Sequence, residues 1–138
     1  MRHETVTTVT RRVVLMDSIS MIGPADRGCI VISGSHGGRI SGAFALKHPP
    51  ALVAFYDAGR GKNGAGIAAL ARSEDAGIPA IAISHDTARI GDVMDAWAHG
   101  RISTCNAPAV AARVATGMTI AEGCARFQAQ LTEDQPPS

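Results

Sequence analysis

Four segments of the chain gather residue types that could do chemistry. Each follows a short apolar run and is rich in Ser, His, Asp, Gly or basic residues: 17–20, 33–39, 57–66 and 84–92. The connections at the other ends of these runs, around residues 48–50 and 76–79, carry no comparable set. Because the carboxyl ends of parallel strands share one edge of a sheet, the asymmetry favours a single active site there. The alternative is that these loops only turn the chain and cap helices.

The turn Ser-Gly-Ser-His-Gly-Gly at residues 33–38 joins an apolar run to a helical pattern. A serine between small residues in such a turn resembles the nucleophile elbow of α/β-hydrolases. The resemblance implies attack by Ser35, with the backbone amides of Gly37 and Gly38 binding the developing oxyanion. The sequence departs from that pattern because Ser33 replaces its first glycine and the chain is too short for that fold's large sheet. Both serines could instead cap the next helix.

Two histidines in the polar segments are candidate general bases. Imidazole titrates near neutrality, so His36 or His85 could take a proton from Ser35 or from a water molecule, while Asp57 orients the ring. The order Ser35, Asp57, His85 matches that of the α/β-hydrolase triad. The fragment Ser35-His36-Gly37 also resembles the Thr-Ser-His loop of phosphotransferase phosphohistidine domains, which implies a phosphocarrier role.

The third segment contains the spacing Gly59-x-Gly61-x-x-Gly64 between a strand and a helix. This spacing resembles the dinucleotide-binding fingerprint, although the second mononucleotide-binding half is missing. We therefore predict that the helix starting near Gly64 binds a substrate anion at its N-terminus, where Lys62 adds positive charge and Asn63 lies beside it.

The fourth segment supplies a possible carboxylate clamp. A guanidinium can bind a carboxylate through two parallel hydrogen bonds, so we predict that Arg89, with Asp92, contacts the substrate. The two residues are three apart at a helix start and could instead pair with each other. Asp86 could be no more than a helix cap.

A metal site is not expected. His36, His85, Asp57 and Asp86 could converge on a divalent ion, but no HxH or HxxxH spacing supports this, and we predict neither a metal nor another cofactor.

Four apolar runs predict the strands that would position these residues. Val and Ile dominate the runs at 13–16, 29–32, 52–56 and 80–83, as in strands covered on both faces. Helical patterns follow three of them. The expected fold is α/β, a three-layer sandwich around a small, mostly parallel sheet of about four strands, Rossmann-like or flavodoxin-like, with a helical C-terminus. The connection 17–28 is short for a helical crossover, so the first two runs could also be antiparallel.

Local sequence patterns also predict an edge strand and the starts of individual helices. The segment 4–10 could form an edge strand, and Ile40 is expected on the apolar side of a helix over 40–47. Ser103 or Thr104 is expected to cap a short helix over 107–115. Thr119 and Glu122 form a capping box that opens the last helix.

Composition limits the classes of protein and of partner. The chain has 138 residues, 46% hydrophobic and 18% charged, which suits one domain over 1–132 and a flexible tail over 133–138. A net charge of +1 without a basic block favours neither nucleic acid nor a membrane as partner. Three cysteines without a CxxC motif, and an N-terminus without an apolar leader, indicate a cytoplasmic protein. Abundant small residues suggest a homo-oligomer.

The functional hypothesis is a metabolic enzyme, a hydrolase of an amide- or ester-like bond in a small anionic carboxylate substrate. A lyase or isomerase could use the same His and Asp groups for proton transfer. A nucleotide- or phosphate-binding module and a phosphohistidine carrier are the non-catalytic alternatives.

Overall fold

The chain forms a sheet in which neighbouring strands follow one another in sequence. The structure, a computed structural model, describes residues 3–7, 11–57 and 67–134. Within these residues the sheet has six strands in the order β1-β2-β3-β4-β5-β6. They are β1 (His3–Thr7), β2 (Arg12–Met16), β3 (Ile30–His36), β4 (Leu52–Tyr56), β5 (Ala80–Ile83) and β6 (Ile102–Cys105). Strands β2 to β5 are parallel, and β1 and β6 are antiparallel edge strands.

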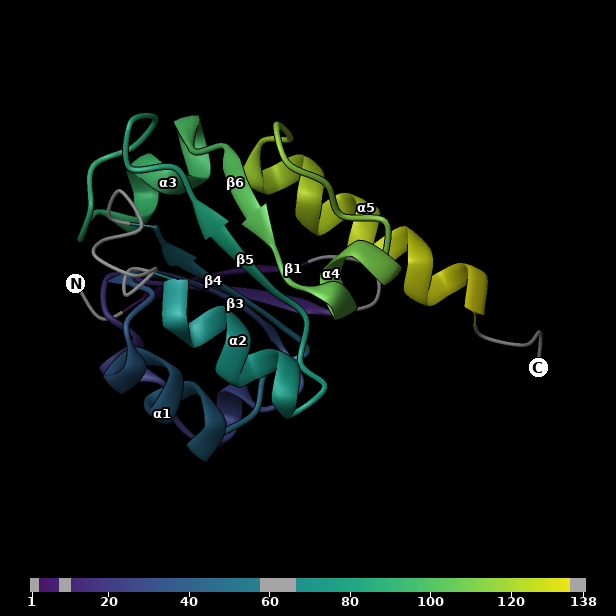
Figure 1. Cartoon of the computed structure of the whole chain (residues 1–138), viewed down its shortest axis with the longest axis horizontal. Helices are drawn as coiled ribbons and strands as arrows, with labels where there is room; N and C mark the ends of the chain where they lie inside the picture. The colour runs from purple at the N-terminus through teal and green to yellow at the C-terminus, as the bar shows by residue number, and fades with distance from the viewer. Residues whose placement is uncertain (1–2, 8–10, 58–66, 135–138) are drawn as a thin grey trace.

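Helices cover both faces of the sheet, so the predicted three-layer α/β sandwich is confirmed (Figure 1). Helices α1 (Arg39–Lys47) and α2 (Ala68–Asp75) lie side by side on one face. The other face carries α3 (Val93–His99), the short α4 (Ala107–Ala111) and the C-terminal α5 (Ile120–Asp134). In the part of the chain that the structure describes, none of the helices has the length and apolar character needed to cross a membrane.

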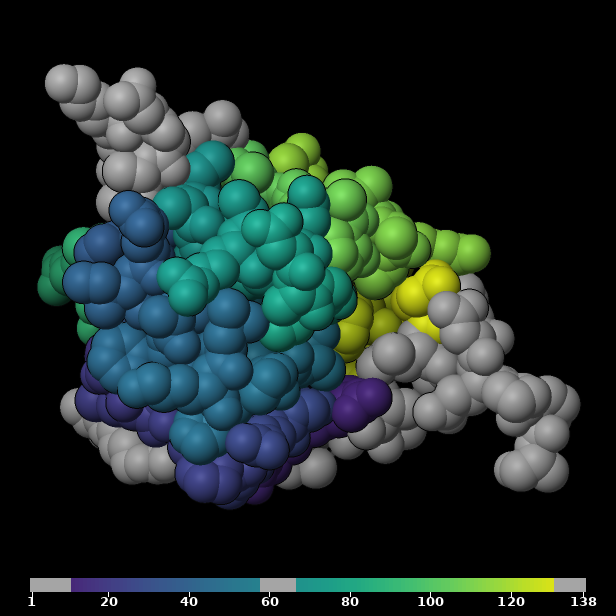
Figure 2. Space-filling model, turned by 60° about the horizontal axis from the view of Figure 1, so that its bottom comes forward, coloured from purple at the N-terminus to yellow at the C-terminus, as the bar shows by residue number. Residues whose placement is uncertain are grey.

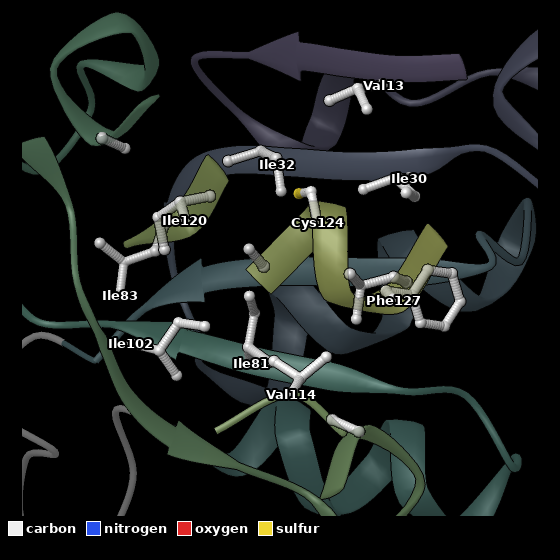
Figure 3. Packing of buried hydrophobic residues seen from close by; sticks show 14 of the residues in the cluster. Val13, Ile30, Ile32, Ile81, Ile83, Ile102, Val114, Ile120, Cys124 and Phe127 are labelled. Atoms are coloured by element: carbon white, nitrogen blue, oxygen red, sulfur yellow. The ribbon is translucent and has the colours of Figure 1, made fainter. Parts of the chain in front are cut away.

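The sheet separates two hydrophobic cores, which explains the uninterrupted apolar runs. Along β2, Val13 and Leu15 point to the α5 side, whereas Val14 and Met16 point to the side of α1 and α2. Alternate residues of a strand face opposite sides, so a strand covered twice needs apolar residues throughout. Figure 3 shows the α5 side, where Cys124 lies over the sheet.

The first two apolar runs pair in parallel, which decides between the two predicted directions. Their connection contains no α-helix but two short 3-10 turns, η1 (Ile19–Met21) and η2 (Pro24–Asp26). Asp26 is buried and accepts a hydrogen bond from the backbone N–H of Gly23. Compact 3-10 turns therefore complete the parallel crossover in a connection without an α-helix.

The orientation of α1 differs from the prediction at one residue. Helices α1 and α2 lie at the front of the face shown in Figure 2. Ile40, expected on the apolar side of its helix, is instead 76% exposed. That expectation was wrong because Ser41, Gly42 and Ala45 form the buried side of α1.

The segment after Gly100 differs from the prediction. Ser103 and Thr104 lie on strand β6 and do not cap a helix. The cap of α4 is Asn106, whose side chain accepts from the backbone N–H of Ala109. Thr119 and Glu122 do form the predicted capping box. At its other end α5 continues through residue 134, so residues 133 and 134, expected in the tail, belong to the helix.

Candidate active site

The residues that follow β4 and β5 are in direct contact. Asp57 comes immediately after β4, and its backbone N–H donates to the carbonyl oxygen of Ile83 at the end of β5. Two residues further on, His85 turns back to Asp57. The Nδ1 atom of His85 lies 2.8 Å from Oδ1 of Asp57, and the backbone N–H of His85 donates to the same oxygen at 3.1 Å. Parallel pairing of β4 with β5 therefore brings these two residues together.

The Asp57 carboxylate is held from a third strand as well. Only 4% of Asp57 is exposed, and its Oδ2 accepts a hydrogen bond of 2.6 Å from the hydroxyl of Ser103 on β6. A buried carboxylate needs such donors, because an unsatisfied buried charge is costly. Both carboxylate oxygens are thus engaged, and their orientation toward His85 is fixed.

Sequence reasoning missed Ser103. The nearest signal is the run Ile102-Ser103-Thr104, whose β-branched residues after Gly100 are typical of a strand. Even with that strand predicted, its antiparallel pairing with β5 would still have been needed to place the hydroxyl beside Asp57.

The second ring nitrogen of His85 faces a more open environment. Its Nε2 lies 3.2 Å from Oδ1 of Asp86, whose side chain is 81% exposed. The hydrogen bond to Asp57 raises the pKa of His85, and the charge of Asp86 adds to this effect. When Nδ1–H is donated to the buried carboxylate, the lone pair of the neutral ring is on Nε2, beside Asp86. This arrangement suits a general base that later returns the proton as an acid.

Ser35 does not join this pair. Its hydroxyl accepts a hydrogen bond of 2.9 Å from the backbone N–H of Ile19 in η1. It lies at the end of β3, and β4 separates that strand from β5, which precedes His85. Among the residues that the structure describes, Ser35 has no hydrogen bond to a histidine.

The two glycines predicted to hold an oxyanion have backbone roles. The N–H of Gly37 donates to the carbonyl oxygen of Tyr56 at 2.8 Å, and its own carbonyl accepts from Ala69 at 2.8 Å. Its amide is therefore occupied and is not available to an oxyanion. Gly38 is the N-cap residue of α1, and it has no side chain to complete the cap.

His36 lies elsewhere on this edge. It is the last residue of β3 and is exposed. Its ring lies over Gly38, where an added Cβ would come within 2.7 Å of the imidazole Cε1. His36 lines a cavity beside α1 and α2, together with Arg39 and Arg72.

The predicted clamp residues Arg89 and Asp92 are engaged with α3. The backbone N–H of Arg89 donates to Oδ2 of Asp95 at 2.7 Å, and Oδ1 of Asp92 caps α3 by accepting from the N–H of Asp95. The Arg89 hydrogen bond and the nearby His99 lower the pKa of Asp95. Asp92 therefore caps a helix, while the Arg89 side chain is exposed and forms no ion pair within the described ranges.

The loop before α3 is fixed to the ends of β2 and β3. The side chain of Asp17 accepts from the N–H of Val93 at 3.1 Å, and the N–H of Gly91 donates to the carbonyl of Gly34 at 2.8 Å. An added Cβ on Gly34 would meet the Asp17 carbonyl oxygen at 2.4 Å. Glycine at 34 is therefore required for this close approach.

The remaining predicted residues, Lys62, Asn63 and Gly64, lie outside the described residues. Across 3–7, 11–57 and 67–134, no three His, Cys, Asp or Glu side chains are grouped as a metal site would need. Comparison of the chain with protein-family models, with curated proteins and with solved structures gave no match.

Proposed function

We propose that the protein is a hydrolase of an amide- or ester-like bond, in which His85 acts as general acid–base and Asp57 orients it. The observation that carries this proposal is the 2.8 Å contact between Nδ1 of His85 and a carboxylate that is 4% exposed. A buried carboxylate behind a half-exposed imidazole is an arrangement that both orients the ring and stabilises its protonated form.

The proposed reaction uses water as the nucleophile. Nε2 of His85 accepts a proton as the water oxygen forms a bond to the carbonyl carbon of the substrate. The imidazolium then donates this proton to the leaving nitrogen or oxygen as the carbon–leaving-group bond breaks. Water fits this role better than Ser35, because the Ser35 hydroxyl is bound to Ile19 and β4 lies between the strands that precede the two residues.

The proposed substrate is a small carboxylate, and the exposed Arg89 supports this class. A guanidinium on the loop that carries His85 could bind the carboxylate through two hydrogen bonds. We further propose that the protein is cytoplasmic and a homo-oligomer. The three free thiols, Cys29, Cys105 and Cys124, agree with a reducing compartment.

A second candidate, proton transfer in an isomerase or lyase, is favoured by Asp86. Its carboxylate lies 3.2 Å from Nε2 of His85 on the open side of the ring. Two acid–base groups at one position could remove a proton from carbon and return it to another atom.

The test is a screen of small amides, esters and hydroxy acids with purified protein, followed by variants on the substrate found. His85→Ala and Asp57→Asn are each expected to lower kcat by about 100-fold or more, as loss of general base catalysis does. Ser35→Ala is the matched control and should retain turnover. Loss of activity in Ser35→Ala with full activity in His85→Ala would overturn the proposal.

A further inference from the structure

Asp86 lies against the ring nitrogen of His85 that the proposed catalysis uses. Its Oδ1 is 3.2 Å from Nε2, while Oδ1 of Asp57 is 2.8 Å from Nδ1. The imidazole therefore has a carboxylate at each of its two nitrogens. The two carboxylates differ in their surroundings, because Asp57 is buried and the Asp86 side chain is 81% exposed.

The turn that carries His85 and Asp86, between β5 and α3 in Figure 1, is fixed at both ends. The N–H of Ser84 donates to the carbonyl oxygen of Arg101 at 2.8 Å, and the N–H of Arg101 donates to Oγ1 of Thr87 at 3.0 Å. The Thr87 hydroxyl in turn donates to the carbonyl oxygen of Ser84 at 2.8 Å. The main chain thus keeps residue 86 beside the ring, while its exposed side chain can rotate.

The protonation state of His85 decides whether the contact with Asp86 is favourable. An ionised carboxylate only accepts hydrogen bonds, and both ring nitrogens carry a proton only in the imidazolium. The imidazolium is therefore complementary to both carboxylates. In the neutral ring Nδ1–H is donated to Asp57, so the lone pair of Nε2 faces Oδ1 of Asp86 and two acceptors stand 3.2 Å apart.

The charged groups around the ring act in the same direction. In the part of the chain that the structure describes, Asp57 faces the ring from the end of β4 and Asp86 faces it from the turn. Ser103 of β6 donates to Asp57, and the guanidinium of Arg101 donates to a backbone carbonyl of the following loop. The hydrogen bond to Asp57 and the charge of Asp86 both raise the pKa of His85.

We infer that Asp86 is a proton-controlled cover on Nε2 of His85: its carboxylate lies on the ring in the imidazolium state and turns into water once the ring is neutral. An exposed ion pair is weak, so loss of the ring proton is enough to release it. Nε2 then becomes accessible in the protonation state in which it can accept a proton. The movement of Asp86 does not depend on hydrolase activity; only its consequence, access of water to Nε2, rests on the proposed function.

The test is an NMR titration of the isotope-labelled full chain that follows both residues. Long-range proton–nitrogen correlations of the His85 ring report its protonation and tautomer, and the Hα–Hβ couplings of Asp86 report its side-chain rotamer. Below the His85 midpoint the couplings should have the values of one staggered rotamer. Above the midpoint they should move to averaged values, and the two transitions should coincide in pH.

The His99–Asp95 pair is an internal control in the same sample. Nδ1 of His99 lies 2.9 Å from Oδ1 of Asp95, whose Oδ2 accepts from the N–H of Arg89. Neutral His99 can still donate from Nδ1, so this contact survives loss of the ring proton. The couplings of Asp95 should therefore stay constant as His99 titrates.

Two variants separate the cover from a fixed side chain. In Asp86→Asn the amide can accept from Nε2–H or donate to its lone pair, so the couplings at position 86 should stay constant through the His85 midpoint. In His85→Ala the couplings of Asp86 should be averaged throughout this pH range.

Wild-type Asp86 couplings that do not change at the His85 midpoint, or that are averaged on both sides of it, would overturn the inference. So would a transition in Asp86→Asn at the His85 midpoint. None of these measurements uses a substrate, so their outcome is separate from success or failure of the hydrolase screen.

Discussion

Nδ1 of His85 is 2.8 Å from Oδ1 of Asp57, and the backbone N–H of His85 donates to the same oxygen. The imidazole and the main chain of one residue are therefore both anchored on one buried carboxylate oxygen. The contact fixes the ring orientation and raises the pKa of His85, and each consequence can be measured separately.

Replacing Asp57 by Asn should lower the pKa of His85. The amide keeps much of the side-chain shape but removes the negative charge that favours imidazolium. NMR titration of the His85 ring protons in both proteins measures the shift, and His99 serves as an internal control. An unchanged or higher His85 pKa in Asp57→Asn would contradict the assigned cause.

The pH dependence of turnover should follow the same group. A general base works in its neutral form, so kcat should rise as pH passes upward through the raised pKa of His85. In Asp57→Asn this rise should move to lower pH.

The free energy of unfolding should change with pH in the opposite direction. The stabilisation by protonated His85 is fully present below the pKa of His85 in the unfolded chain, and it is lost as pH rises through the pKa of His85 in the folded protein. In urea unfolding, the stability difference between wild type and His85→Ala should become smaller as pH rises through this range.

Removing the Ser103 hydroxyl should destabilise the protein. Ser103→Ala takes away the 2.6 Å hydrogen bond to Oδ2 of Asp57, a nearly buried carboxylate, and should lower the free energy of unfolding by about 1–3 kcal/mol. The same variant should lower kcat, because the carboxylate is held less firmly. Ser103→Thr retains a hydroxyl and should recover most of both. Full stability and turnover in Ser103→Ala would show that Asp57 does not need this donor.

Asn106 should be one of the least replaceable residues outside the site. Its Oδ1 accepts from the N–H groups of Ala80 and Ala109, and its Nδ2 donates to the carbonyls of Leu70 and Ile78. Asn106→Ala leaves these buried groups unsatisfied and should cost about 3–5 kcal/mol in urea unfolding.

The matched control for Asn106 is Val110→Ala on the same helix, a residue that is 60% exposed. It should change the free energy of unfolding by about 0.5 kcal/mol or less. Equal effects of the two substitutions would contradict the role given to Asn106.

A methyl group at position 34 should not be tolerated. Gly34→Ala would place its Cβ 2.4 Å from the Asp17 carbonyl oxygen, and should cost more than about 2 kcal/mol by forcing β2 and β3 apart. Gly23→Ala has nothing within 4 Å of the new Cβ and should be nearly neutral. Thermal unfolding of both variants checks the contrast. A stable Gly34→Ala protein would show that the backbone there can move.

The sequence alone determined the layers of this protein. Strands such as 52–56 are buried on both faces and are therefore apolar at every position, and such an uninterrupted run can be recognised in the sequence. Local signals also located the capping box at Thr119 and Glu122, because both partners lie within one helical turn. Polar residues after the parallel strands could be assigned to one edge for the same topological reason.

Only the tertiary structure decided which polar residues meet. Ser35, His36, Asp57 and His85 all lie at or just beyond the carboxyl ends of parallel strands. Yet Asp57 pairs with His85, Ser35 binds Ile19, and His36 lines a separate cavity. Ser103 joins Asp57 from an edge strand 46 residues away. Contacts of this kind depend on strand order, register and side-chain direction, which are set by packing across the whole sheet. Short-range sequence patterns therefore do not predict these contacts.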